Sequence, residues 1–192
     1  MTKKLPKCRN CKERFYPLNN NALQKFCMNH DECIKAKVEY DRELREKKAK
    51  REWNKKKREI KESLKTREDY FQEALKAFNA YIRERDKDKP CISCDKPAGK
   101  YRITSGHFYP QGTYRNIALD EDNAAGQCWW DCNKNKHGNL LEYRPRLEKR
   151  IGKERLEALD KRRLEVRKYT IPELIELKVI YKDKLKKLKE YG

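Results

Sequence analysis

The sequence predicts a mainly helical α+β protein in which two small cysteine-rich modules are joined and flanked by charged helices. Charged residues make up 42 % of the chain and hydrophobic residues 36 %, a balance too polar for one large core. The eight cysteines fall into two separate groups of four. We therefore expect four segments: a cysteine-rich finger over 1–34, a basic helical linker over 35–65, a cysteine-bearing module over 66–151 and C-terminal helices over 152–192.

The cysteines are expected to bind metal rather than to form disulfides. The opening MTKKLPKCRNC lacks the apolar stretch of a signal peptide, and no run of apolar residues is long enough to span a membrane. We therefore expect a cytoplasmic protein with no membrane partner. In a reducing compartment, thiolates bound to zinc are the better interpretation of two four-cysteine groups.

The N-terminal group has the spacing of a structural zinc finger. Cys8 and Cys11 form a CxxC pair, and Cys27 supplies a third ligand. The fourth ligand is Cys33 or His30. Four protein ligands leave no open coordination position, so this Zn²⁺ is expected to be structural and to replace a core that so short a segment cannot build.

The central group predicts a second structural Zn²⁺, held by Cys91, Cys94, Cys128 and Cys132. Such a site would fix the end of one helix against the start of the next. The residues between Cys94 and Cys128 would then form a loop of defined geometry, which contains the sequences SGHFYPQG and DEDNAAGQC.

Residues 35–65 predict one long, solvated helix. The segment contains no Gly or Pro, and acids precede lysines by four residues, as in Glu43/Lys47 and Glu52/Lys56. Apolar residues are sparse, so the helix is not a core element. It is interpreted either as a basic arm that lies along a phosphate backbone or as a charged spacer.

A second helix is expected to begin after Thr66, with Asp69 completing a capping box. Its buried face is predicted to comprise Phe71, Ala74, Leu75, Phe78, Tyr81 and Ile82. Strands are expected around 101–109 and 114–119. Further helices are expected over 142–151 and 152–168, and a last one from Thr170, capped by Glu173, with an apolar stripe of Leu177, Tyr181, Leu185 and Leu188.

The net charge of +19, with 50 Lys and Arg, indicates a nucleic-acid partner. Each phosphate that a cation neutralises releases counterions, which favours binding to a dense phosphate polymer. We expect phosphate contacts from Arg102, Arg115, Lys134 and Lys136. Trp129 and Trp130 are expected mainly to pack, with at most one of them touching DNA.

Several motifs together resemble known families. A CxxC, a Gly-His, an Asn before a second cysteine pair and a following Cys-Asn resemble a zinc-bound HNH endonuclease, or ββα-metal, module. The longer set KLPKCRNCKERFYP, KPCISC, GHFY, EDNAAGQC, CN, GN and YRPRLEKRIG resembles the NinG (Rap) family of recombination proteins of lambda-like phages. This resemblance implies an endonuclease that cuts branched DNA, such as D-loops and Holliday-type junctions, in the host cell cytoplasm.

The HNH resemblance also implies roles for individual residues. His107 matches the general base, and Asn123 matches the Asn that braces the loop and orients that base. Asn133 and His137 lie four apart and could point from one helical face toward a catalytic Mg²⁺ or Mn²⁺.

Two positions depart from the family pattern. Gly106 stands where many HNH modules carry a metal-binding acid, so Asp120 or Asp122 would have to supply a carboxylate. The last cysteine pair is C-x3-C rather than CxxC. The missing acid keeps a non-catalytic DNA-binding protein open as an alternative, and nicking of linear duplex is a third. A homodimer would suit symmetric cutting of a four-way junction.

Overall fold

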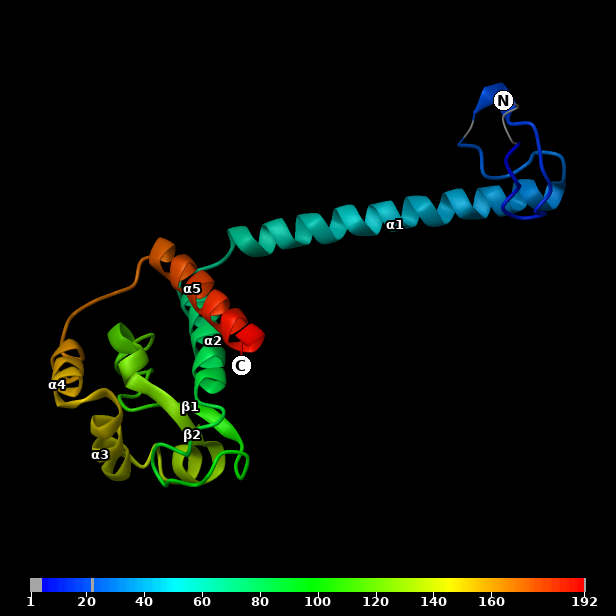
Figure 1. The fold of residues 1–192 in the computed structure, drawn as a ribbon. Coiled ribbons are helices and arrows are strands. Elements are labelled where there is room, and N and C mark those ends of the chain that lie inside the picture. The colour runs from blue at the N-terminus through cyan, green and yellow to red at the C-terminus, as the bar shows by residue number, and fades with distance from the viewer. Residues whose placement is uncertain (1–4, 22, 192) are drawn as a thin grey trace. The chain divides into compact units, whose positions relative to one another are not determined.

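The computed structural model describes residues 5–21 and 23–191, and the chain forms two compact units, Met1–Leu64 and Lys65–Gly192 (Figure 1). The expected boundary after residue 151 is absent, because helices from 152–192 pack into both hydrophobic clusters of the second unit. The basic helix belongs to the same unit as the N-terminal cysteines. The four predicted segments are therefore organised as two units.

The N-terminal unit combines a cysteine-rich loop region with α1 (Asp31–Ser63). A β-bridge joins Lys7 to Arg14, and a 3-10 turn, η1, spans Leu18–Asn20. The predicted helix over 35–65 is present but begins earlier, with two acids in its first turn that favour the positive end of the helix dipole. As a result, Cys33 lies inside the helix and is buried with Phe15 and Phe26.

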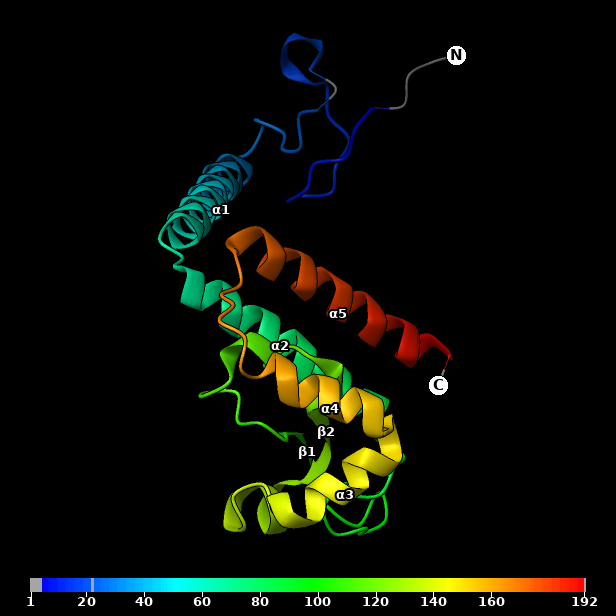
Figure 2. The same cartoon turned by 90° about the vertical axis from the view of Figure 1, so that its left-hand side faces the viewer.

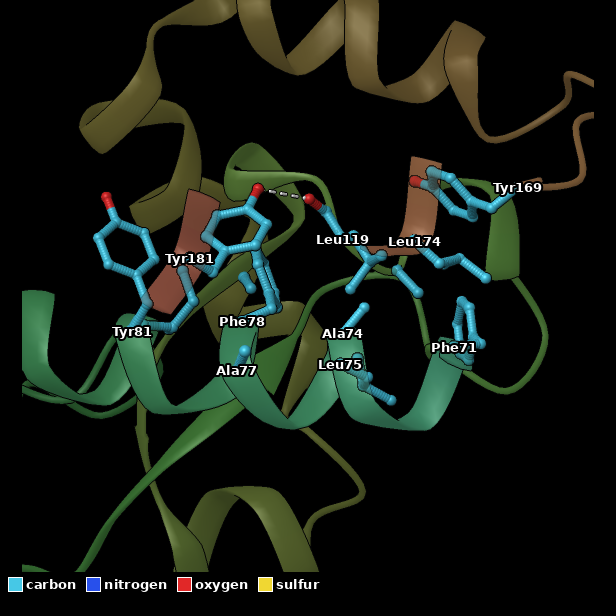
Figure 3. Packing of buried hydrophobic residues seen from close by; sticks show 13 residues of the cluster. Phe71, Ala74, Leu75, Ala77, Phe78, Tyr81, Leu119, Tyr169, Leu174 and Tyr181 are labelled. Atoms are coloured by element: carbon cyan, nitrogen blue, oxygen red, sulfur yellow. Dashed lines mark hydrogen bonds between the residues drawn. The ribbon is translucent and has the colours of Figure 1, made fainter. Parts of the chain in front are cut away.

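The main core of the second unit lies between α2 (Arg67–Arg85) and α5 (Ile171–Tyr191). The capping box of Thr66 and Asp69 is confirmed, as is the predicted buried face of α2. Figure 3 shows this face packed against Leu174 and Tyr181 of α5, with the Tyr181 hydroxyl donating to the Leu119 carbonyl at 2.9 Å. Ala118 and Leu119, which precede the second strand in the chain, therefore pack with residues of both helices.

The sheet is one antiparallel hairpin of β1 (Ile103–His107) and β2 (Ala124–Cys128). In its register, Ile103 faces Cys128 and His107 faces Ala124. The strand expected over 114–119 was wrong: residues Arg115–Ile117 form a 3-10 turn, η2, which the Ala118 N–H closes onto the Arg115 carbonyl. The true second strand, AAGQC, lacks the β-branched residues that mark strands in sequence.

Two helices follow the hairpin, α3 (Leu140–Ile151) and α4 (Lys153–Arg162). Figures 1 and 2 show them on the side of the hairpin away from α2, where Tyr143, Leu147, Leu156 and Leu159 form the second core. The helix expected over 152–168 stops at Arg162. There the Asn116 side chain donates to the carbonyls of Arg162 and Glu165, which satisfies acceptors at the helix end.

A buried carboxylate ties the hairpin to the helices on both sides. Asp86, at the end of α2, is fully buried and accepts the Gly126 N–H of β2 at 2.8 Å. It also pairs with Arg85 and with Arg150 of α3. Burial opposes ionisation, but these cations and the N–H donor prevail and lower the pKa of Asp86 to about 2. Asp86 therefore joins strand β2 of the hairpin to the end of α2 and to α3.

The two longest helices are strongly charged. α1 has 33 residues and α5 has 21, and lysines recur along both. Within the described part of the chain, no helix is both long enough and apolar enough to cross a membrane.

Candidate functional site

The N-terminal cysteines form a cluster suited to zinc. The sulfur atoms of Cys8, Cys11, Cys27 and Cys33 all lie within 4.8 Å of one another, with Cys8–Cys33 and Cys11–Cys27 at 3.7 Å. A tetrahedral zinc with bonds of about 2.3 Å places its sulfur ligands about 3.8 Å apart. A disulfide would instead need about 2.05 Å. The cluster could therefore bind zinc as four thiolates.

The Cys8 thiol loses its proton more readily than an ordinary thiol does. Its burial favours the neutral form, but backbone N–H groups of Cys27, Cys11 and Asn10 outweigh this and lower the pKa of Cys8 to about 6. The Cys27 N–H lies 3.3 Å from the Cys8 sulfur. Donors of this kind stabilise the thiolate that a zinc ion requires.

The fourth ligand is better assigned to Cys33 than to His30. His30 is the N-cap of α1, and its Nε2 lies 3.1 Å from Glu13 Oε2. Both side chains are at least half exposed, whereas Cys33 is buried among the other three sulfurs. His30, Glu13 and Cys11 do form a separate group of potential ligands, but that group shares Cys11 with the sulfur cluster.

The central cysteines form an equivalent cluster. The sulfurs of Cys91, Cys94, Cys128 and Cys132 lie within 4.8 Å of one another, and Cys94–Cys128 are 3.8 Å apart. Backbone N–H groups support two of the sulfurs: Cys128 donates to Cys91 at 3.2 Å and Cys132 to Cys128 at 3.3 Å. This cluster could also bind zinc, which would join the start of the module to the end of β2.

The extra residue in the C-x3-C pair is accommodated by a π-helix. The segment Trp129–Asn135, η4, follows β2 directly and carries Cys132. A π-helical turn closes between residues i and i+5 and so holds more residues than an α-helical turn. The longer spacing between Cys128 and Cys132 therefore still brings the two sulfurs into one cluster.

His107 is held in one tautomer by a backbone carbonyl. Its Nε2 lies 3.0 Å from the Ala118 carbonyl oxygen, which can only accept, so Nε2 carries the hydrogen and Nδ1 keeps its lone pair. The ring also lies against Phe78 of α2. Burial lowers the pKa of His107 below its ordinary 6.5, against a smaller opposing effect of the Ala118 bond. The imidazole is therefore neutral at pH 7.

Asn123 fixes the loop that supplies this carbonyl. Its side chain is fully buried, donates to the carbonyls of Tyr109 at 3.0 Å and Ile117 at 3.2 Å, and accepts the Tyr109 N–H at 2.8 Å. Ile117 precedes Ala118, the acceptor for His107. Asn123 thus braces both ends of the 109–117 loop.

The opposite face of the hairpin carries a buried amide network. Gln127 donates to Ser93 Oγ and to the Gly138 carbonyl, each at 2.6 Å, and accepts from Asn133 Nδ2 at 2.9 Å. A Cβ on Gly106 would stand 2.5 Å from Gln127 Oε1, so the Gln127 side chain fills the space beside this glycine. The Gln127 side chain therefore leaves no free space beside Gly106.

Asn133 and His137 do not share a helical face. The π-helix ends at Asn135, and His137 lies in an exposed turn with a positive φ of 46°. The expectation of one helix carrying both was wrong, because Gly138 turns the chain inward to place its carbonyl on Gln127. Asn133 borders Gln127, on the face of the hairpin away from His107.

The remaining acidic candidates are engaged by arginines. Asp122 is buried and pairs with Arg155 and Arg162, and Asp120 pairs with Arg162 while capping the 3-10 turn η3 (Glu121–Asn123). Among the residues that the structure describes, the groups of three or more potential metal ligands do not include His107. Asp120 and Asp122 thus serve the fold.

The predicted DNA contacts differ in their surroundings. Arg102 lies over the Trp129 ring, and Lys134 lies 4.5 Å from the centre of the Trp130 ring, which is 53 % exposed. Arg115 pairs with Glu68 and stacks on Phe71 at 4.1 Å, so its charge is used within the fold. Lys136 is exposed.

Sequence reasoning missed two parts of this arrangement. Gln127 is a polar residue between a glycine and a cysteine in a buried strand, and that unusual position is the signal that could have marked it. The role of the Ala118 carbonyl could not have been predicted from the sequence, since every residue has a backbone carbonyl.

The comparison with known families uses the whole chain. The family described as Bacteriophage Lambda NinG protein matches residues 1–191. The chain belongs to the NinG family. The matched residues include both cysteine clusters, the hairpin and the C-terminal helices.

Individual NinG proteins are similar over a shorter stretch. The chain is 37 % identical over 127 residues to Protein ninG of Escherichia phage 933W and of Escherichia phage lambda, and 36 % identical over 128 residues to that of Salmonella phage P22. These alignments cover 66 % to 67 % of this chain and 61 % to 62 % of the relatives. The chain thus spans less than two thirds of the length of these relatives. No solved structure matches.

Proposed function

We propose that this NinG-family chain is a metal-dependent endonuclease that cuts branched recombination intermediates such as D-loops and Holliday-type junctions. The observation that carries the proposal is His107, a neutral imidazole whose Nε2–H is bound by the Ala118 carbonyl at 3.0 Å. The proposal is supported by the order of the motifs along the chain, in which CISC is followed by Gly-His, then by Asn123 and then by Cys-Asn. It is also supported by the net charge of +19. The choice of branched DNA rests on the family resemblance.

In this proposal His107 acts as the general base. Nδ1 accepts a proton from a water molecule as the water oxygen forms a bond to the scissile phosphorus. The bond from phosphorus to the leaving oxygen of the sugar breaks, and that oxygen takes a proton from solvent. The Ala118 carbonyl would stabilise the imidazolium that forms, and Asn123 would hold the loop that carries it.

A divalent ion such as Mg²⁺ or Mn²⁺ would relieve charge at the phosphate. The described residues do not fit a carboxylate-rich site for it, because Gly106 replaces the usual acid and Asp120 and Asp122 are paired with arginines. Asn133 faces Gln127 on the side of the hairpin away from His107, and His137 lies in a separate exposed turn, so neither is placed to hold an ion beside His107. No step above depends on their contact with a metal.

The packing of Gln127 against Gly106 favours a second candidate. If no metal-binding group occupies that place, the chain would be a non-catalytic zinc-containing protein that binds recombination DNA. Both candidates require DNA binding that weakens as salt rises.

One experiment separates these candidates. Matched linear, D-loop and four-way DNAs would be incubated with the zinc-loaded protein and with its His107→Ala variant, with and without Mg²⁺ or Mn²⁺. Cleavage of branched DNA that requires the divalent ion and disappears in the variant is expected. Binding without any cut would support the non-catalytic candidate, and equal cutting of linear DNA would remove the preference for branches.

A further inference from the structure

The second half of α1 carries an unusually one-sided charge. Six residues form what is here named the α1 basic face: Lys50, Arg51, Asn54, Lys57, Arg58 and Lys61. At about 100° per residue, these positions fall within about 120° of the helix circumference. Two of the three acids in this half of the helix, Glu52 and Glu59, lie about 140° to 160° from the centre of that face, and the third, Glu62, lies about 80° from it, beyond the edge of the face. A mixed-charge sequence therefore produces one acid-free surface.

The α1 basic face is exposed and charged. All six residues are exposed, and Arg51, Asn54, Lys57, Arg58 and Lys61 line a shallow groove of about 560 Å³. In the first half of the helix, lysines are paired, as in Lys37–Asp41 and Lys47–Glu43. Within residues 5–21 and 23–191, by contrast, no ion pair is found for the five cations of the α1 basic face.

From this arrangement we infer that the α1 basic face binds the phosphate backbone of duplex DNA, independently of base sequence. The α1 basic face extends about 16 Å along the helix. Because duplex DNA carries one negative charge for about every 1.7 Å of its axis, a face of this length lies opposite several phosphates. Lys, Arg and Asn are typical phosphate-contacting side chains. The α-helix is also of a width that the major groove, about 12 Å across, admits between its two backbones.

The helix is suited to this task by rigidity as well as charge. It contains no Gly or Pro, and its first turns are held by the packing of Ala36 and Tyr40 on the N-terminal cysteine cluster. The zinc that this cluster could bind would therefore anchor a charged rod rather than a catalytic group. The inference rests on DNA as the partner in the proposed function, but not on cleavage.

The test compares two triple variants of equal charge. In the first, Lys50→Gln, Lys57→Gln and Lys61→Gln neutralise the α1 basic face. In the second, Lys48→Gln, Lys55→Gln and Lys56→Gln remove the same charge from positions at least about 100° away from its centre. Gln and Lys have similar helix propensities, and circular dichroism would verify that both variants keep α1. Affinity for a linear duplex would be measured over a range of salt without Mg²⁺ or Mn²⁺.

The face variant is expected to lose affinity by about tenfold or more and to reduce the slope of log K against log salt by about 2 to 3, because three phosphate contacts are lost. The second variant should bind within about threefold of wild type. Equal losses in the two variants would show a general charge effect and overturn the inference, as would unchanged binding by both. A wild-type protein without affinity for any DNA would overturn the proposed function as well.

Discussion

His107 donates its Nε2 hydrogen to the carbonyl of Ala118, 3.0 Å away, so the orientation of the proposed base depends on a backbone atom of a loop. That loop is in turn held by the buried side chain of Asn123. The histidine, the loop and the asparagine form one unit, and changes in the three are expected to have related effects.

Replacement of His107 by alanine is expected to reduce cleavage of a four-way junction by at least about 10²-fold, the usual contribution of a general base. Junction binding and zinc content should remain at wild-type values, because His107 belongs to neither cysteine cluster. Single-turnover cleavage, gel-shift affinity and metal analysis measure the three quantities. Wild-type cleavage by the variant would exclude His107 as the base.

Asn123→Ala is expected to destabilise the second unit by about 1–3 kcal/mol, since buried carbonyl and N–H groups of the loop lose their partners. Thermal unfolding measures this cost. An aspartate at this position could still accept the Tyr109 N–H, but its second oxygen would face the Tyr109 and Ile117 carbonyls, so Asn123→Asp should be at least as unstable as Asn123→Ala. If Asn123 also positions the base, both variants should shift the pH profile of cleavage. Loss of stability with an unchanged pH profile would limit Asn123 to a structural role.

Cleavage is expected to rise with pH through an inflection below 6.5, because burial lowers the pKa of His107 and the neutral form is the base. The free energy of unfolding is also expected to rise with pH. The unfolded chain binds more protons at this histidine than the folded chain does, so its contribution is complete above pH 6.5 and is lost as the pH falls toward the lowered folded value. The difference between wild type and His107→Ala in unfolding at pH 5 and pH 7.5 isolates this contribution from the thiols.

Metal analysis of the purified chain is expected to find two zinc ions. Cys33→Ser and Cys132→Ser should each remove one of them, because each takes a sulfur from a different four-sulfur cluster. His30→Ala serves as the control and should retain both, since His30 lies outside the four sulfurs. Loss of zinc in His30→Ala together with its retention in Cys33→Ser would reverse this assignment.

Gly106→Ala is expected to destabilise the second unit by about 1–3 kcal/mol, because the added Cβ would meet Gln127 Oε1 at 2.5 Å and Gln127 Cβ at 2.9 Å. Gly112→Ala is the matched control, because a Cβ there meets nothing within 4 Å. Chemical denaturation of both variants measures the difference. Equal stability of the two would mean that Gln127 moves aside at little cost, and that a larger group could be accepted at Gly106.

Local patterns in the chain predicted much of the fold. The capping boxes at Thr66 and Thr170 and the apolar face of α2 lie within single turns of helix, so their signals are visible in neighbouring residues. The strand Ala124–Cys128 was not predicted, because small residues carry little strand preference and its pairing with β1 joins distant segments.

Cysteine spacing by itself determined two four-ligand groups, and composition determined a basic, largely helical chain. Spacing could not decide between Cys33 and His30, nor whether a C-x3-C pair could close a cluster. The tertiary structure decided both: α1 begins early enough to bury Cys33, and a π-helical turn takes up the extra residue. It also set His107 against Ala118 and Gln127 against Gly106, contacts that arise only when segments distant in sequence pack together.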